Sequence, residues 1–132
     1  MRYLGPEWMD AARRALAEDE RLAERTTGVR LTLEQAVDAG PDGGEIRWHI
    51  VIDDGSVTLA EGPAQRFDVR FTTSYDTAAQ IATGRLSAQR AFVDGRLRIG
   101  GDLTVLVAHQ RALASLEDVF ADLRRHTSFP PP

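Results

Sequence analysis

The alternation of apolar and polar positions divides the chain into helices and strands. Residues 6–25 carry apolar side chains at helical spacing, among them Trp8, Ala12 and Leu16, and Pro6 suits a first helical position. Next come residues 29–37, 45–52, 56–61 and 67–72, where apolar side chains occupy every second position, as in strands with one buried face. Asp54 and Gly55 are typical of a hairpin between the second and third strands.

The period then changes from two to about 3.6 residues. Ser74 is a predicted helix cap, and Gly84 ends that helix. A short helix follows from Ser87 to Gly95, and a brief fifth strand contains Leu97 and Ile99. We expect one long last helix whose apolar side includes Leu103, Leu106, Val107, Leu113, Leu116, Phe120 and Leu123, capped by Asp102. This order predicts an α+β fold in which helices cover one face of a single sheet and the other face meets water.

Length and composition restrict the class of protein. The 132 residues suit one domain, which we divide into an N-terminal helix (1–27), four strands (28–72), helices with a fifth strand (73–126) and a tail (127–132). The net charge of −4, with both signs mixed along the chain, argues against nucleic acid as a partner. No segment resembles a signal peptide or approaches the ~20 apolar residues of a bilayer span, so a cytoplasmic location is expected.

The residue types that carry most catalysis are absent or badly spaced. There is no cysteine, and none of the three histidines has a metal ligand at suitable spacing. Asp53 and Asp54 fall in a turn, where aspartate is favoured for backbone reasons. His109 lies near the apolar side of the last helix, either as a polar anchor in a cavity or as a packing residue. The sequence thus predicts no catalytic residue, no metal site and no cofactor.

The most specific pattern lies between residues 84 and 102. It consists of Gly84, Arg85 and Leu86, then Gln89, Ala91 and Phe92, then Gly95, Arg96, Leu97 and Ile99, and finally Gly101 and Asp102. In order and spacing this pattern resembles the sterol carrier protein type-2 family, whose members hold lipids in an apolar cavity. The resemblance extends from about residue 28 to residue 120. It implies a five-stranded mixed sheet with a crossover between the third and fourth strands, and an apolar cavity between sheet and helices.

The resemblance also implies a function, which is non-catalytic binding or transfer of apolar lipids. We expect fatty acids or acyl-CoA ahead of sterols, no more than transient contact with membrane surfaces, and a homodimer as one possible assembly. Eight residues are expected to contact the ligand: Phe71, Ile81, Gln89, Phe92, Leu97, Leu103, Leu106 and Val107. Gln89 has an alternative role as a cap of loop backbone, and Phe92 and Leu97 have one as ordinary core.

Two other functions stay open from sequence. In the first, the fold is kept but the cavity is filled, and the domain acts by dimerising or by docking a partner. Thr104 and Val107 favour this alternative, because they replace a glycine and a methionine often found early in the last helix of the family. The second is an enzyme acting on acyl-CoA, for which no nucleophile and base pair can be assembled from the sequence.

Overall fold

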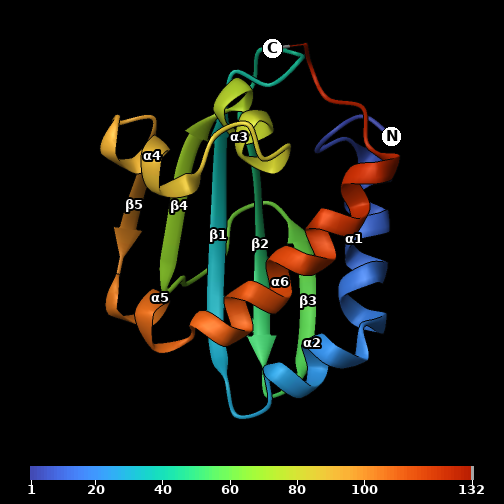
Figure 1. The fold of residues 1–132 in the computed structure, drawn as a ribbon, viewed down its shortest axis with the longest axis vertical. Coiled ribbons are helices and arrows are strands. Elements are labelled where there is room, and N and C mark those ends of the chain that lie inside the picture. Colours follow the sequence, from blue (N-terminus) through green and yellow to red (C-terminus); the bar gives the residue numbers. More distant parts are fainter. Residues whose placement is uncertain (132) are drawn as a thin grey trace.

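The fold is one five-stranded sheet with helices on one face, in a computed structural model that describes residues 1–131 (Figure 1). The strands are β1 (Arg30–Asp38), β2 (Ile46–Asp53), β3 (Ser56–Glu61), β4 (Val69–Ser74) and β5 (Leu97–Gly101). The helices are α1 (Pro6–Glu18), α2 (Glu20–Arg25), α3 (Tyr75–Ala82), α4 (Ala88–Val93), α5 (Thr104–Ala108), α6 (Gln110–Leu123) and the 3-10 turn η1 (Arg124–His126).

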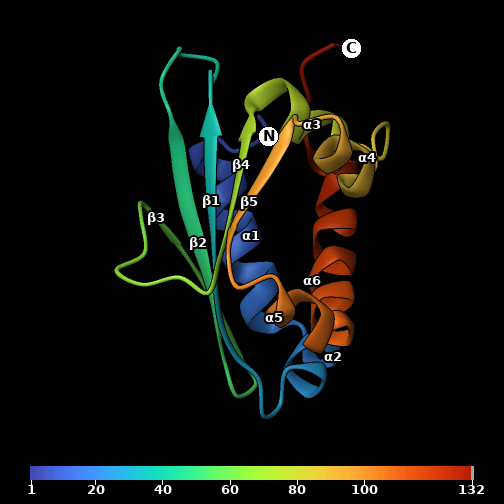
Figure 2. The same ribbon diagram turned by 90° about the vertical axis from the view of Figure 1, so that its left-hand side faces the viewer.

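The strands follow the order β3-β2-β1-β4-β5 across the sheet. β1 and β4 are parallel, and the other neighbouring pairs are antiparallel. The chain therefore leaves β3 at one edge and crosses to β4 on the far side of β1, as the family resemblance implied. Figure 2 shows the helices on one side of the sheet. The predicted α+β class with a single mixed sheet is confirmed.

Two of the three predicted helix caps, Ser74 and Ser87, are confirmed, whereas the N-cap of α5 is Leu103 and Asp102 lies one residue before it. The first and the last predicted helices are each broken into two. Ser74 and Ser87 accept hydrogen bonds from the backbone N–H of Thr77 and Arg90, at 3.1 and 3.0 Å. The prediction of a single N-terminal helix was wrong, because the Asp19 carboxylate caps a second helix, α2. The single long last helix was also wrong. The chain leaves helical geometry at His109 (φ −119°, ψ 34°), and it is the second piece, α6, that turns apolar residues into the core.

The core lies between the sheet and the pair α1 and α6. Trp8, Trp48 and Phe120 meet in its middle, with ring centroids 5.6 to 6.0 Å apart. The chain termini close one side of this core: the backbone of Tyr3 bonds to that of Ser128. Of the predicted tail 127–132, Pro132 lies outside the described residues. Ser128 forms a bridge with Arg2, and Phe129 lies against the Tyr3 ring.

The opposite face of the sheet is only partly open to water, which corrects the expectation of a wet face. The crossing segment between β3 and β4 lies on that side, away from the helices (Figure 2). Glu34 and Ala36, which point to that face, are 0% and 1% exposed. The alternation in β1 was predicted correctly, but no pattern in the sequence indicated the segment that covers these two positions.

Candidate functional site

The face of the sheet that meets the helices has two unlike halves. α6 crosses β1, β2 and β3, whereas α4 and α5 lie at opposite ends of β5 (Figure 1). Strand pairing places Trp48, Gln35, Phe71 and Ile99 in one row across β2, β1, β4 and β5. Trp48 is buried, but the other three are only half-buried. In the half made by β4 and β5, the middle of the face, at Phe71 and Ile99, is therefore apolar and incompletely covered.

The helices around β4 and β5 continue this apolar surface. Leu106 on α5 and Leu113 on α6 are half-buried and pack against the core without being enclosed. Ile81 on α3 is also half-buried. α5 has no buried residue at all. The large exposed hydrophobic side chains of the described residues all fall between residues 92 and 107: Phe92 (48% exposed), Val93 (79%), Leu103 (48%) and Val107 (70%). They flank β5 on both sides along the chain.

The eight residues expected to contact ligand occupy three kinds of position. Phe71, Ile81 and Leu106 are half-buried, and Phe71 and Leu106 pack against the core. Leu97 is buried at the start of β5, beside Thr73. Gln89 is exposed in the first turn of α4, and the remaining three, which are Phe92, Leu103 and Val107, are exposed near the two ends of β5. Whether all eight contact one ligand stays a prediction.

The expected cavity between sheet and helices also stays a prediction. Two depressions in residues 1–131 are open hollows of about 260 and 300 Å³ beside α2 and the junction of α5 with α6. The first is lined by Arg25, Val29 and the turn around His109, and the second by Glu24, Arg25 and Arg111. His109 therefore lines a surface hollow, and Arg25 and Arg111 make both hollows partly charged.

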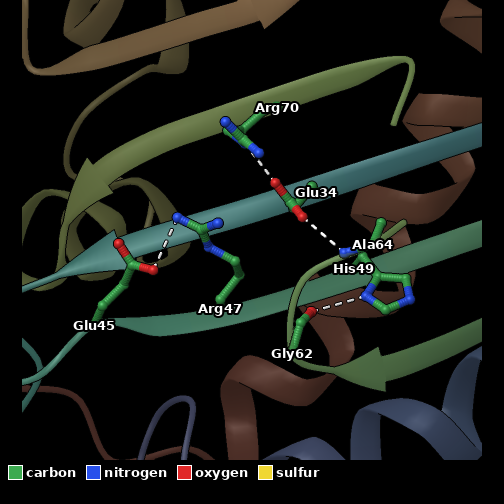
Figure 3. A network of polar contacts seen from close by, with 7 residues as sticks. All are labelled: Glu34, Glu45, Arg47, His49, Gly62, Ala64 and Arg70. Carbon is green, nitrogen blue, oxygen red and sulfur yellow. Dashed lines mark hydrogen bonds and ion pairs between the residues drawn. The ribbon is translucent and has the colours of Figure 1, made fainter. Parts of the chain in front are cut away.

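The other face of the sheet carries a polar network that fixes the chain crossing (Figure 3). Glu34 accepts hydrogen bonds from Arg70 Nε and from the backbone N–H of Ala64, the latter at 2.8 Å. His49 Nδ1 lies 2.9 Å from the carbonyl oxygen of Gly62. Burial raises the pKa of Glu34, but the hydrogen bonds from Arg70 and Ala64 and the nearby positive charge outweigh it, so the pKa is lowered. These contacts tie residues 62–70 to the sheet.

Other polar residues singled out in the sequence have structural roles. Asp54 (φ +47°) and Gly55 (φ +90°) form the hairpin turn, and Asp54 Oδ1 accepts a 2.6 Å hydrogen bond from the Gly28 N–H. The turn interpretation is thus confirmed for Asp54, whereas Asp53 is the last residue of β2 and forms an ion pair with Arg30. No group of three or more His, Cys, Asp or Glu side chains in residues 1–131 is placed to hold a metal ion. Nor does any described helix have the length and apolar content needed to cross a membrane.

The sequence analysis did not predict two polar groups at the centre of the helix-facing side of the sheet. Gln35 follows Leu31 and Leu33 at the same spacing, and so points to the apolar face. Its signal was visible as a polar side chain in an apolar alternation. The second is Trp48, whose indole Nε1 is buried without a hydrogen-bond partner. No sequence signal could have found that, since it depends on what surrounds the ring.

Comparison with known proteins finds a matching family and similar structures. The family model described as the SCP-2 sterol transfer family matches residues 10–114. A conserved hypothetical protein from Thermus thermophilus is similar in structure, with a TM-score of 0.71 and 22% identity over 97% of this chain and 92% of that one. A crystal structure of sterol carrier protein 2 has a TM-score of 0.71 and 22% identity, covering 90% of this chain and 97% of its own.

Domain 2 of the sterol carrier protein of Helicoverpa armigera has a TM-score of 0.64 and 26% identity, over 88% of this chain and 87% of that one. No curated protein sequence matches the chain. The family match covers most of the sequence, including the segment between residues 84 and 102 and the half-buried strands β4 and β5. This chain belongs to the SCP-2 sterol transfer family.

Proposed function

We propose that this protein reversibly binds an apolar lipid against the helix-facing side of β4 and β5. One observation carries the proposal: the exposed hydrophobic side chains of residues 92–107 flank the half of the sheet where Phe71 and Ile99 are incompletely covered. Exposed apolar groups gathered in one region mark interaction sites more often than single ones do. Phe71, Ile81, Leu97 and Leu106 would form the wall of the site.

Phe92, Leu103 and Val107 would form the rim, and Gln89 would reach the ligand from the start of α4. The driving force is removal of apolar surface from water, about 25 cal/mol per Å². Because this force has little directionality, we expect a broad range of ligands, with fatty acids and acyl-CoA preferred to sterols. In this function the lipid is bound and released without any chemical step. A cytoplasmic location stays a prediction from the sequence.

A second function has one specific observation in its favour. β5 is an edge strand, paired only with β4, and the exposed Val93 and Val107 lie close to it in the chain. An edge strand can pair with another chain, so a homodimer formed through this edge would cover the same apolar groups. In that case the domain would act by docking, without a lipid.

The test is displacement of a fluorescent fatty acid, with native mass spectrometry of the purified protein as a second readout. We expect Val107→Asp to weaken binding about fivefold or more, because it places a charge on the rim. Ala121→Asp on α6 is the matched control, since it adds the same charge to an exposed helical position outside the site. Its affinity should equal that of the wild type.

Two results would overturn the lipid proposal. One is failure of the wild type to bind the probe at micromolar concentration. The other is equal binding by Val107→Asp and the wild type. If the wild type also sediments as a dimer that Val107→Asp dissociates, the docking function replaces it.

A further inference from the structure

Gln35 is a polar side chain in the middle of an apolar surface. It lies between Trp48 on β2 and Phe71 on β4, with Leu33 and Val37 before and after it on the same face of β1. The side chain is half-buried. We find no side-chain hydrogen bond of Gln35 within residues 1–131, and its amide is not sealed from solvent. The Gln35 side chain is therefore partly accessible and has no side-chain partner among residues 1–131.

Trp48, its neighbour, is a buried donor without an acceptor. The residue is 5% exposed, and Nε1 has no hydrogen-bond partner. The ring is held by edge contacts with Trp8 and Phe120, at 5.6 and 6.0 Å between centroids. Native proteins seldom leave a buried donor unpaired, because the lost bonds to water are not replaced. Such a donor is explained when a bound group supplies the acceptor.

Strand pairing places these two groups at the inner end of the proposed lipid site. Neighbouring strands lie about 4.8 Å apart, so the row Ile99, Phe71, Gln35, Trp48 leads from the edge of the sheet into the core in steps of that size. A lipid over Ile99 and Phe71 that extends along this row meets Gln35 first. The Trp48 ring lies one strand further in.

The charges around this row restrict the polar group that could bind there. Arg47, Arg70 and Arg98 have the opposite orientation on their strands, toward the other face of the sheet. The charged residue in the same row is Glu61, next to Trp48 at the exposed end of β3. A carboxylate or phosphate at Gln35 would thus be desolvated with no cation in its row, which is unfavourable. An uncharged oxygen avoids that cost.

We propose that Gln35 and Trp48 form a hydrogen-bonding subsite for an uncharged hydroxyl or carbonyl group of the bound lipid. The inference rests on the proposed function and adds the chemistry and orientation of the ligand. The Trp48 N–H donates to the ligand oxygen, and the Gln35 amide accepts from a hydroxyl or donates to a carbonyl. The neutral polar end of the lipid then lies innermost, and a charged end, where present, stays at the rim.

The test compares three ligands that share one alkyl chain: 1-dodecanol, dodecane and dodecanoate, each displacing a fluorescent alkyl probe. The wild type should bind dodecanol about tenfold more tightly than dodecane. Gln35→Leu and Trp48→Phe should each reduce that ratio at least threefold. Leu106→Ala is a matched variant of the apolar wall, and it should weaken all three ligands alike.

A spectroscopic readout covers the case in which a variant does not fold. In wild-type protein labelled with ¹⁵N, the Trp48 indole N–H resonance should move when dodecanol binds but not when dodecane binds, with the Trp8 resonance as internal reference. The subsite proposal would be overturned by an unchanged ratio of dodecanol to dodecane affinity in Gln35→Leu. A Trp48 resonance that does not move when dodecanol binds would also overturn it. Failure of all three ligands and the probe to bind the wild type would instead overturn the proposed function itself.

Discussion

Glu34 and Arg70 lie in register on the parallel strands β1 and β4, and Arg70 donates a hydrogen bond to a carboxylate that has no exposed surface. The arginine keeps 37% of its side chain exposed. Its guanidinium also lies 4.3 Å from the centre of the Phe67 ring. One ion pair thus joins the two strands whose partnership depends on the long crossing from β3.

The Glu34 pair should make stability depend on pH in the acid range. The pKa of Glu34 is lowered in the folded protein, so its contribution is complete above the ordinary value of 4.5 and is lost as pH falls through the lower, folded-state pKa. Glu34→Gln should lower the free energy of unfolding by about 1–3 kcal/mol near pH 7. Urea denaturation at about pH 7 and about pH 3 measures the difference, which should shrink at the lower pH.

Asp53→Asn serves as the control for this experiment. It removes the acid of an ion pair with Arg30 in which both side chains are mostly exposed, at 65% and 74%. Exposed pairs contribute about 0–1 kcal/mol, so its effect should be small. A Glu34→Gln variant as stable as the wild type near pH 7 would contradict the role given to the buried pair.

Gly101, at the end of β5, should tolerate no side chain. Its φ of +95° is unfavourable for other residues, and a Cβ there would lie 2.2 Å from the Asp68 carbonyl oxygen. We expect Gly101→Ala to cost about 2 kcal/mol or more in thermal or urea unfolding. Gly100→Ala is the matched control, because a Cβ at Gly100 would meet nothing within 4 Å. Equal losses in the two variants would contradict this account.

Removal of the Ser74 cap should weaken α3 and the apolar surface that it carries. The Ser74 hydroxyl accepts a hydrogen bond from the Thr77 N–H at the first turn. Ser74→Ala should therefore cost about 1 kcal/mol of stability, with faster amide exchange in α3 than in α6. Ser56→Ala, at an exposed position at the start of β3, should change neither. Unchanged exchange in α3 would show that packing alone holds this helix.

Local sequence patterns predicted most of the fold. They predicted much less of the candidate site. Alternation predicted the strands, and Ser74, Ser87 and Gly84 predicted the helix ends, since these signals act within a few residues. The burial of Glu34 depends on contacts between distant segments. So does the position of Gln35 beside Phe71, which arises from pairing between strands more than thirty residues apart. Such neighbours cannot be read from a single sequence.

The break at His109 divides the last helical segment into a well-anchored and a weakly anchored part. α6 is anchored by five buried residues, whereas α5 has none, and the two meet at one residue outside helical geometry. If α5 covers one end of the lipid site, the anchored part of the protein sets how tightly a ligand is held. The weakly anchored turn sets its residence time. Substitutions in α5 could then speed exchange between carriers without lowering the amount carried.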